Sequence, residues 1–203
     1  MTAIRKFAPA LLILLTASSL IISDVQGEES FIQSSGFESL SQLQKSPKGW
    51  FKTVIKKYSD YVDFIWDNET AYRDSMSISI RIDKNHPDER NVAYNWYTDL
   101  MNWEVGKDYE LSCWVKGKEL KDTAWICIQC WDENMTKMLN FSTTQKDYKL
   151  DGSFDWKQAG TVFNIPLKTH KVVVRAGIGA PKNNGGQVWF DELHIRKLKG
   201  KSE

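Results

Sequence analysis

Hydrophobic and polar residues alternate in short runs through most of the chain after residue 50. In Ser75–Ile82, isoleucines occupy alternate positions, and serines and an arginine stand between them. Tyr109–Val115 and Ala124–Trp131 repeat the same period of two. An extended strand turns successive side chains to opposite faces, so this period is typical of a strand that buries one face.

Eight segments carry this pattern and are expected to be β-strands: Phe51–Tyr58, Ser75–Ile82, Asn91–Leu100, Asp108–Lys116, Ala124–Asp132, Lys157–Asn164, Lys171–Ile178 and Val188–Arg196. Clusters of Gly, Pro, Asn and Asp separate several of them, as turns require. Regularly spaced short strands favour an all-β protein, a two-sheet antiparallel β-sandwich. Helical periodicity is scarce, and only Ser39–Lys45 is expected to form a short helical turn.

The segment Glu133–Trp156 leaves two interpretations open. It is either a functional loop or a further pair of strands, because it is long for an unstructured connection. Phe141 and Tyr148 indicate that part of it pairs with other strands.

The N-terminus has the features of a secretory signal over residues 1–27. Arg5 and Lys6 precede an apolar run from Phe7 to Ile22, and small residues end the segment near Gly27. The alternative is a retained membrane anchor, for which the run is short. We therefore expect a secreted (extracellular or periplasmic) protein with one domain over residues 28–203. No second apolar span follows, so no membrane association is expected after cleavage.

The charge and the amino-acid composition limit the classes of binding partner that we expect. The chain has 27 basic and 26 acidic residues, and removal of residues 1–27 makes the two counts equal. Interspersed charges of equal number give no electrostatic case for nucleic-acid binding. The nine tryptophans are more informative, because an indole offers a large flat apolar face to a core or to a ligand.

The three cysteines are Cys113, Cys127 and Cys130. Cys127 and Cys130 have the spacing of a redox motif, but they lie in a strand pattern without a helix N-terminus to lower a thiol pKa. Burial, or one disulfide, is favoured over redox chemistry. Cys113 and Cys130 both point inward by their strand periodicity, so they are the pair expected if a bridge forms.

Ordered motifs along the chain give a resemblance to a known family. Gly36-Phe37-Glu38 stands near the start, Gly106–Gly117 in the middle, and Val188-Trp189-Phe190-Asp191-Glu192-Leu193 at the end. Together with Gly49-Trp50, Asp74–Ile80 and Trp156, they resemble the β-jelly-roll carbohydrate-binding modules of xylanases and glucanases, which are galactose-binding-like sandwiches. The resemblance covers residues 36–195 and is more specific for the fold than for the ligand.

The resemblance implies a structural calcium ion (Ca²⁺) that joins the first and last strands. Its carboxylates would be Glu38 and Asp191, with backbone oxygens near Asp74 or Ser75, since calcium favours hard oxygen ligands. Glu192 stands where the family has a second Asp. The alternative is that Glu38 and Asp191 are only hydrogen-bonded, which a buried Asp in a strand requires in any case.

The outward positions of three predicted strands define a candidate ligand surface. Sugar rings bind to flat aromatic side chains flanked by amides or Arg. The residues expected to line a concave face are Trp96, Trp125, Gln129, Trp131 and Arg175. The alternative is that the tryptophans pack in the core, as Trp50, Trp103, Trp156 and Trp189 are expected to do from their places relative to the family. A protein partner could cover the same aromatic face.

No nucleophile, metalloprotease or phosphate-loop motif occurs, and His86, His170 and His194 have no Ser or Cys at a catalytic spacing. No catalytic residue is therefore assigned, although two distant carboxylates could still meet in the fold. Three sequons, at Asn68, Asn134 and Asn140, would mark exposed loops in a eukaryotic secretory route. The expected function is non-catalytic carbohydrate binding; the alternatives are an extracellular protein-interaction or adhesion domain, or a small glycoside hydrolase or lyase.

Overall fold

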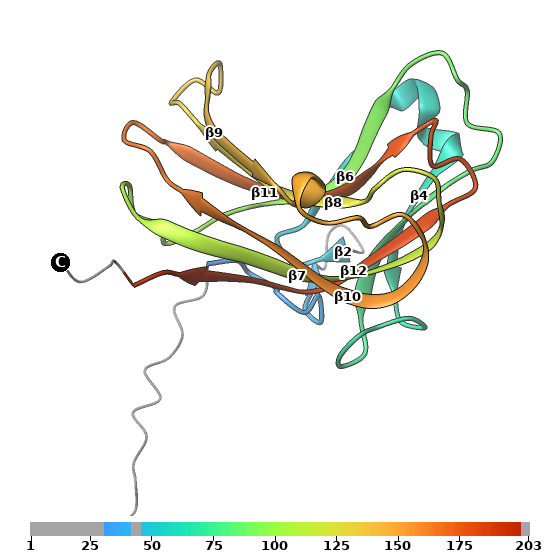
Figure 1. The fold of residues 1–203 in the computed structure, drawn as a ribbon, viewed down its shortest axis with the longest axis horizontal. Helices are drawn as coiled ribbons and strands as arrows, with labels where there is room; N and C mark the ends of the chain where they lie inside the picture. Colours follow the sequence, from blue (N-terminus) through green and yellow to red (C-terminus); the bar gives the residue numbers. More distant parts are fainter. Residues whose placement is uncertain (1–30, 42–45, 200–203) are drawn as a thin grey trace, which may run out of the picture.

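The computed structural model describes residues 31–41 and 46–199, and these form a sandwich of two antiparallel five-stranded sheets (Figure 1). The expected signal segment, residues 1–27, lies outside the described residues. The first sheet has the strand order β10-β7-β12-β5-β4, and the second has the order β3-β6-β11-β8-β9. The predicted all-β, two-sheet antiparallel architecture is confirmed.

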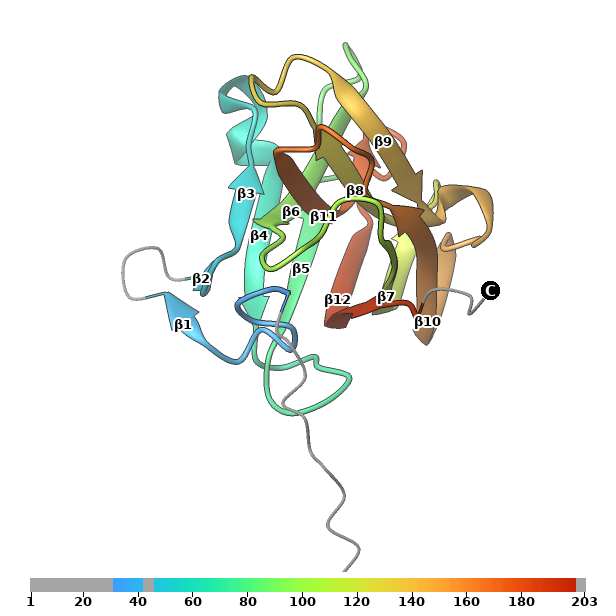
Figure 2. The same cartoon turned by 90° about the vertical axis from the view of Figure 1, so that its left-hand side faces the viewer.

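The strands of the first sheet are β4 (Val62–Asp67), β5 (Ser77–Ile82), β7 (Asp108–Leu120), β10 (Gly152–Asn164) and β12 (Gln187–Lys197). Those of the second sheet are β3 (Phe51–Thr53), β6 (Val92–Asp99), β8 (Trp125–Trp131), β9 (Met138–Thr143) and β11 (Lys171–Ala180). A separate small pair consists of β1 (Leu40–Ser41) and β2 (Ser46–Pro47), and Figure 2 shows β1 beside the two layers. Two 3₁₀ helices are present, η1 (Lys56–Tyr61) and η2 (Thr144–Lys146).

The core lies between the two sheets and is built from one face of each strand. Ile78 and Ile80 of β5 and Phe190 of β12 face Tyr94 and Trp96 of β6, and all five are fully buried. Burial of such side chains is the main source of stability in a sandwich. The alternate residues of the same strands therefore face outward and are left for other contacts.

The region after Trp50 differs from the prediction. The expected strand Phe51–Tyr58 ends at Thr53, and η1 follows it. Within η1, Tyr58 is buried, so this turn contributes to the core as well as reversing the chain. The strand β4 was missed, although Val62, Phe64 and Trp66 alternate with polar residues in the expected way; it pairs with β5 along its whole length.

Two other segments also gave mixed outcomes. The short helix expected over Ser39–Lys45 is wrong where the structure describes it: Leu40–Ser41 is a strand that pairs with Ser46–Pro47, and residues 42–45 lie outside the described part. For Glu133–Trp156 the strand-pair interpretation is correct. It contains β9, which pairs with β8, and the start of β10, which pairs with β7. Tyr148 lies in the connection between them.

The three cysteines are free thiols, and all are buried, so the burial interpretation is confirmed and the disulfide is not formed. Cys113 belongs to β7 of the first sheet and Cys130 to β8 of the second. The Cys113 thiol instead lies 3.3 Å from the backbone oxygen of Asp191, to which it donates a hydrogen bond. Within residues 31–41 and 46–199, no helix has the length and apolar character needed to cross a membrane.

Candidate functional site

The outer face of the second sheet carries a groove. The strand register places Arg175 of β11 directly between Tyr97 of β6 and Cys127 of β8. Gln129 of β8 stands opposite Phe141 of β9 in the same way. These residues alternate with the buried core residues of the same strands, so their side chains lie on the side of the sheet away from the core.

Two adjoining hollows make up the groove. The larger has a volume of about 490 Å³ and is lined by Ala93, Asn95, Trp125, Cys127, Gln129, Trp131, Phe141, Thr143, Gln145 and Arg175. The smaller, of about 400 Å³, is lined by Lys52, Thr53, Val54, Tyr97, Asp99, Met135, Lys171, Val173 and Arg175. Because both include Arg175, the groove crosses all five strands of the second sheet with this arginine near its middle. Its total size suits a small ligand or a segment of a polymer.

Arg175 is held in place by oxygen atoms from three other strands. Its Nε donates to Oε1 of Gln129 (3.0 Å), and its Nη1 donates to Oδ1 of Asn95 (2.9 Å) and to Oγ1 of Thr53 (3.3 Å). The guanidinium also lies 5.1 Å from the centre of the Tyr97 ring. Thr53 Oγ1 donates in turn to Asn95 Oδ1 (3.0 Å), which ties β3 to β6. The polar floor of the groove is therefore one connected network.

A glycine makes room for one of the groove tryptophans. Gly177 of β11 lies between Asn95 of β6 and Trp125 of β8 in the register. A Cβ at this position would come within 2.9 Å of the Trp125 indole and within 2.3 Å of the Tyr94 backbone oxygen. The missing side chain thus allows the indole to lie across the sheet at this end of the groove.

Four of the five predicted ligand-binding residues line the groove together: Trp125, Gln129, Trp131 and Arg175. Trp96 was placed on the wrong face. It is fully buried between the sheets, and its Nε1 donates to the backbone oxygen of Ser79 (3.1 Å). The outward aromatic residue of β6 is Tyr97, which is one position further along the strand and therefore on the opposite side.

The indole nitrogen of Trp131 differs from those of several tryptophans outside the groove. The Nε1 atoms of Trp50, Trp66 and Trp189 each donate to an oxygen, 2.8 to 3.0 Å away, as buried indoles normally do. The Nε1 of Trp131 is buried but has no acceptor among the described residues. Trp50 and Trp189 are buried, in accordance with their predicted packing role.

Sequence reasoning missed several groove residues, chiefly Thr53, Asn95, Tyr97, Phe141 and Gln145. Asn95 and Tyr97 share one side of β6, so the alternation would have found them once Tyr94 and Trp96 were assigned to the core. The others carried no usable signal, because they come from the short strand β3 and from a segment whose structure was left open.

The groove offers little acid–base chemistry. The larger hollow is lined by no Asp, Glu or His. Cys127 lies on its floor, where burial raises the pKa of its thiol to about 12 even though nearby Arg175 acts in the opposite direction. Two of the three histidines lie elsewhere: His86 is buried against Tyr94, and His194 contacts Glu192. His170 is exposed, and its backbone N–H donates to the backbone oxygen of the groove residue Trp131 (2.9 Å). As described, the groove is suited to binding rather than to proton transfer.

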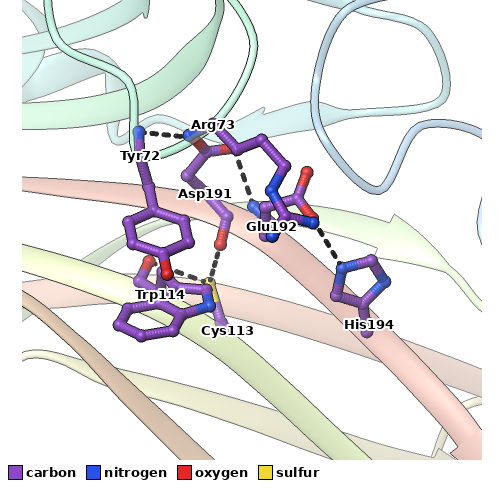
Figure 3. A network of polar contacts seen from close by, with 7 residues as sticks. All are labelled: Tyr72, Arg73, Cys113, Trp114, Asp191, Glu192 and His194. Atoms are coloured by element: carbon purple, nitrogen blue, oxygen red, sulfur yellow. Dashed lines mark hydrogen bonds and ion pairs between the residues drawn. The ribbon is translucent and has the colours of Figure 1, made fainter.

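The predicted metal-binding residues Glu38 and Asp191 lie at a second location. Asp191 belongs to β12 of the first sheet, and a loop after β4 is fastened to it (Figure 3). Asp191 is fully buried. Its Oδ2 accepts hydrogen bonds from the backbone N–H groups of Tyr72 (2.7 Å) and Arg73 (3.1 Å), and its Oδ1 accepts one from Glu192 (2.7 Å). Burial raises the pKa of Asp191 to about 6, although these three hydrogen bonds favour the ionised form.

Glu38 holds the same loop a few residues further along. Its carboxylate accepts from the backbone N–H of Ser75 (3.2 Å) and Met76 (2.7 Å) and from the Ser75 hydroxyl (2.8 Å). We call Glu38, Asp191 and the loop residues 72–76 that they hold the clasp. Glu192 lies beside this clasp, 2.9 Å from His194 and 3.6 Å from Arg73. The early Glu and the late Asp therefore fasten one loop, residues 72–76, to the two ends of the chain.

This donor set does not fit a calcium ion as arranged. Both oxygens of Asp191 and Oε1 of Glu38 already accept hydrogen bonds from backbone N–H groups, and Oε2 of Glu38 accepts one from the Ser75 hydroxyl; the positive ends of these donors repel a cation. Within the described residues, no group of three or more His, Cys, Asp or Glu side chains is placed to hold a metal. The calcium ion stays a prediction.

Comparison with known proteins gives relatives by structure only. No protein-family model matches the sequence, and no curated protein matches it either. The module TmCBM61, solved with β-1,4-galactotriose, has a TM-score of 0.53 at 14% identity; the match covers 84% of this chain and 99% of that one. The xylan-binding CBM22-1 domain of Paenibacillus barcinonensis Xyn10C has a TM-score of 0.52 at 14% identity, with 75% and 88% covered.

Other matches have different activities. A cyclase from Fischerella sp. TAU, in complex with an indolyl butanone, has a TM-score of 0.54 at 12% identity, with 84% of this chain and 98% of that one covered. The match to the enzymatically active domain of bacteriophage CBA120 tailspike protein 4 spans only 20% of that longer chain. At these identities the comparisons establish the fold: this is the β-jelly-roll sandwich found in carbohydrate-binding modules.

Proposed function

We propose that the protein is secreted and binds a carbohydrate in the groove of the second sheet without chemically changing it. The observation that carries this proposal is the combination of aromatic side chains and a polar network in two adjoining hollows that share Arg175. Trp125, Trp131 and Phe141 offer flat apolar surfaces to sugar C–H groups, while Gln129 and Arg175 offer polar atoms to hydroxyl oxygens. Two carbohydrate-binding modules with this fold, one bound to a galactan trisaccharide and one xylan-binding, support the same conclusion.

The chemistry of the lining favours binding over hydrolysis. Glycoside hydrolysis needs two carboxyl groups on either side of the bond that is cleaved. The larger hollow has none, and Asp99 in the smaller one is paired with Lys171 (3.1 Å). The alternative function, binding of a protein partner, can be distinguished from carbohydrate binding by experiment, because a protein partner would bind without any saccharide.

The experiment is binding to a glycan array followed by calorimetry, with the intact protein and with Trp125→Ala and Trp131→Ala. We expect each substitution to weaken saccharide binding at least about tenfold, because each removes one stacking surface. Trp156→Ala, which removes an indole from the first sheet, is the matched control and should bind like the unsubstituted protein. Binding that survives both groove substitutions would remove this face as the site. Release of reducing ends from a polysaccharide would instead establish a hydrolase.

A further inference from the structure

Arg175 has no oppositely charged partner among the residues that the structure describes. Among the residues that line the larger hollow, Arg175 is the only one with an acidic or basic side chain. Its hydrogen-bond acceptors, Gln129, Asn95 and Thr53, are all neutral. Within the described residues it forms no ion pair.

Neighbouring groups do not neutralise this charge. The nearest acidic residue of the groove, Asp99, is paired with Lys171. Cys127, directly across from Arg175 in the register, is a neutral thiol at physiological pH. Lys52, which lines the smaller hollow, has other contacts: its ammonium lies over the Trp96 ring, 4.9 Å from the ring centre, and reaches the backbone oxygen of Phe64. A half-buried cation among aromatic rings with only neutral contacts is costly unless an anion joins it.

The geometry also leaves one part of the guanidinium for such an anion. The described hydrogen bonds use Nε and Nη1, and Nη2 has no partner among the residues that the structure describes. Because three strands fix the other nitrogens, Nη2 is held in a set orientation and loses little freedom when it binds. Arginine in a fixed orientation is well suited to carboxylate and to sulfate or phosphate oxygens.

We propose that the groove selects an acidic saccharide, whose anionic substituent pairs with Arg175 while its ring stacks on the neighbouring aromatic side chains. The inference rests on the proposed carbohydrate-binding function and specifies its ligand class. The anionic group is either the carboxylate of a uronic acid or a sulfate ester, which present the same oxygen chemistry to Nη2. Charge complementarity within a low-dielectric groove then makes the neutral form of the same saccharide a weaker ligand.

The test compares ligands that differ only in charge. Polygalacturonate, alginate and glucuronoxylan are each compared with their carboxyl-reduced forms, and dextran sulfate is compared with dextran. Binding to the intact protein is measured by calorimetry at low and at physiological salt. We expect at least one acidic member to bind about tenfold or more tightly than its neutral counterpart, with a preference that falls as salt rises. The uronate and sulfate arms identify which anion is used.

Two variants assign the preference to the arginine. Arg175→Gln removes the charge and should abolish the difference between acidic and neutral ligands, while Arg175→Lys keeps the charge and should retain part of it. Circular dichroism and thermal melting establish that both variants are folded; if Arg175→Gln does not fold, the salt dependence and the paired ligands still decide the question. Equal binding of all acidic and neutral pairs overturns this inference and leaves the proposed function standing. Absence of any saccharide binding overturns both.

Discussion

The outer faces of the two sheets both carry aromatic and charged residues, but the two faces differ in whether these side chains have partners within the protein. On the first sheet, Tyr72 from the loop after β4 stacks on Trp114, with ring centres 3.9 Å apart, and Trp189 donates its indole N–H to Asp67 (2.8 Å). On the second sheet, Trp125 and Trp131 line an open hollow, and the buried Trp131 nitrogen has no acceptor among the described residues. The first face satisfies its own functional groups, and the second leaves the Trp131 nitrogen without an acceptor among the described residues.

The charged residues show the same difference. On the first sheet, Arg81 pairs with Asp63 and Lys116 pairs with Asp155. On the second, Lys171 pairs with Asp99, but Arg175 hydrogen-bonds only to neutral oxygens. Exposed pairs of the first kind contribute little to stability. An aromatic or charged residue on a sheet face thus indicates a binding site only when its partners within the protein leave part of it unused.

The largest effect that we expect concerns the thiol on the groove floor. Burial raises the pKa of Cys127 from 9.0 to about 12, so the reactive thiolate should be roughly a thousandfold less abundant at pH 8 than for an ordinary thiol. Iodoacetamide labelling followed by mass spectrometry should therefore find Cys127 nearly unreacted in the native protein. In denaturant all three cysteines should react; labelling of only one would mean that a disulfide exists. Rapid native labelling would show that the floor of the second face is open.

The next largest effect tests how firmly the first face is fastened to its loop. Asp191→Ala leaves the backbone N–H groups of Tyr72, Arg73 and Glu192 without their acceptor, and we expect a loss of roughly 3 kcal/mol of unfolding free energy. Asp191→Asn keeps one acceptor oxygen and should lose less. Urea denaturation measures both. Loss of saccharide binding by a folded Asp191 variant would contradict the separation of the two faces.

A smaller effect is expected from loosening the network that orients Arg175. Thr53→Val removes the hydroxyl that links Asn95 to the guanidinium and keeps the shape of the side chain. Saccharide affinity should fall severalfold, which corresponds to about 1 kcal/mol, while the melting temperature changes little. Thr161→Val, in β10 of the first sheet, is the matched control. Unchanged affinity in Thr53→Val would mean that the network does not position the arginine.

The smallest effect concerns calcium. The N–H groups around Glu38 and Asp191 already complete the clasp, so addition of Ca²⁺ or of EDTA should shift the melting temperature by less than about 1 °C. Differential scanning calorimetry measures the shift, with Mg²⁺ as the control ion. A rise of several degrees in Ca²⁺ alone would instead place a cation at the first face, as the family resemblance implies.

The alternation of residues predicted which side chains share a face, and this accounts for most of what the sequence could supply. Trp125, Gln129 and Trp131 are separated by even numbers of positions in one strand, so their common side follows from the period of two alone. Trp96 shows the limit of this reasoning. Both sides of β6 carry an aromatic residue, and the period does not tell which side meets the core.

Residues that act together across strands were harder to predict. Thr53 and Arg175 are brought together only by the strand order β3-β6-β11, which joins segments more than a hundred residues apart in the chain. The clasp was easier to foresee in part, because a buried Asp needs partners. That these partners are the backbone N–H groups of residues 72 and 73 depends on the path of a loop, which no local pattern specifies.

The edges of the sandwich have a consequence for how the protein behaves at high concentration. β9 and β10 are edge strands of different sheets, and Asn140 Nδ2 and the Ser142 hydroxyl donate to backbone oxygens of Asn164 and Val162. At the other side, the edge strand β3 has only three residues. Exposed strand edges are the usual templates for intermolecular pairing and fibre formation. Mutual capping of β9 and β10 and the brevity of β3 reduce the strand edge that is open to such pairing, and β4 (Val62–Asp67) is the remaining edge strand.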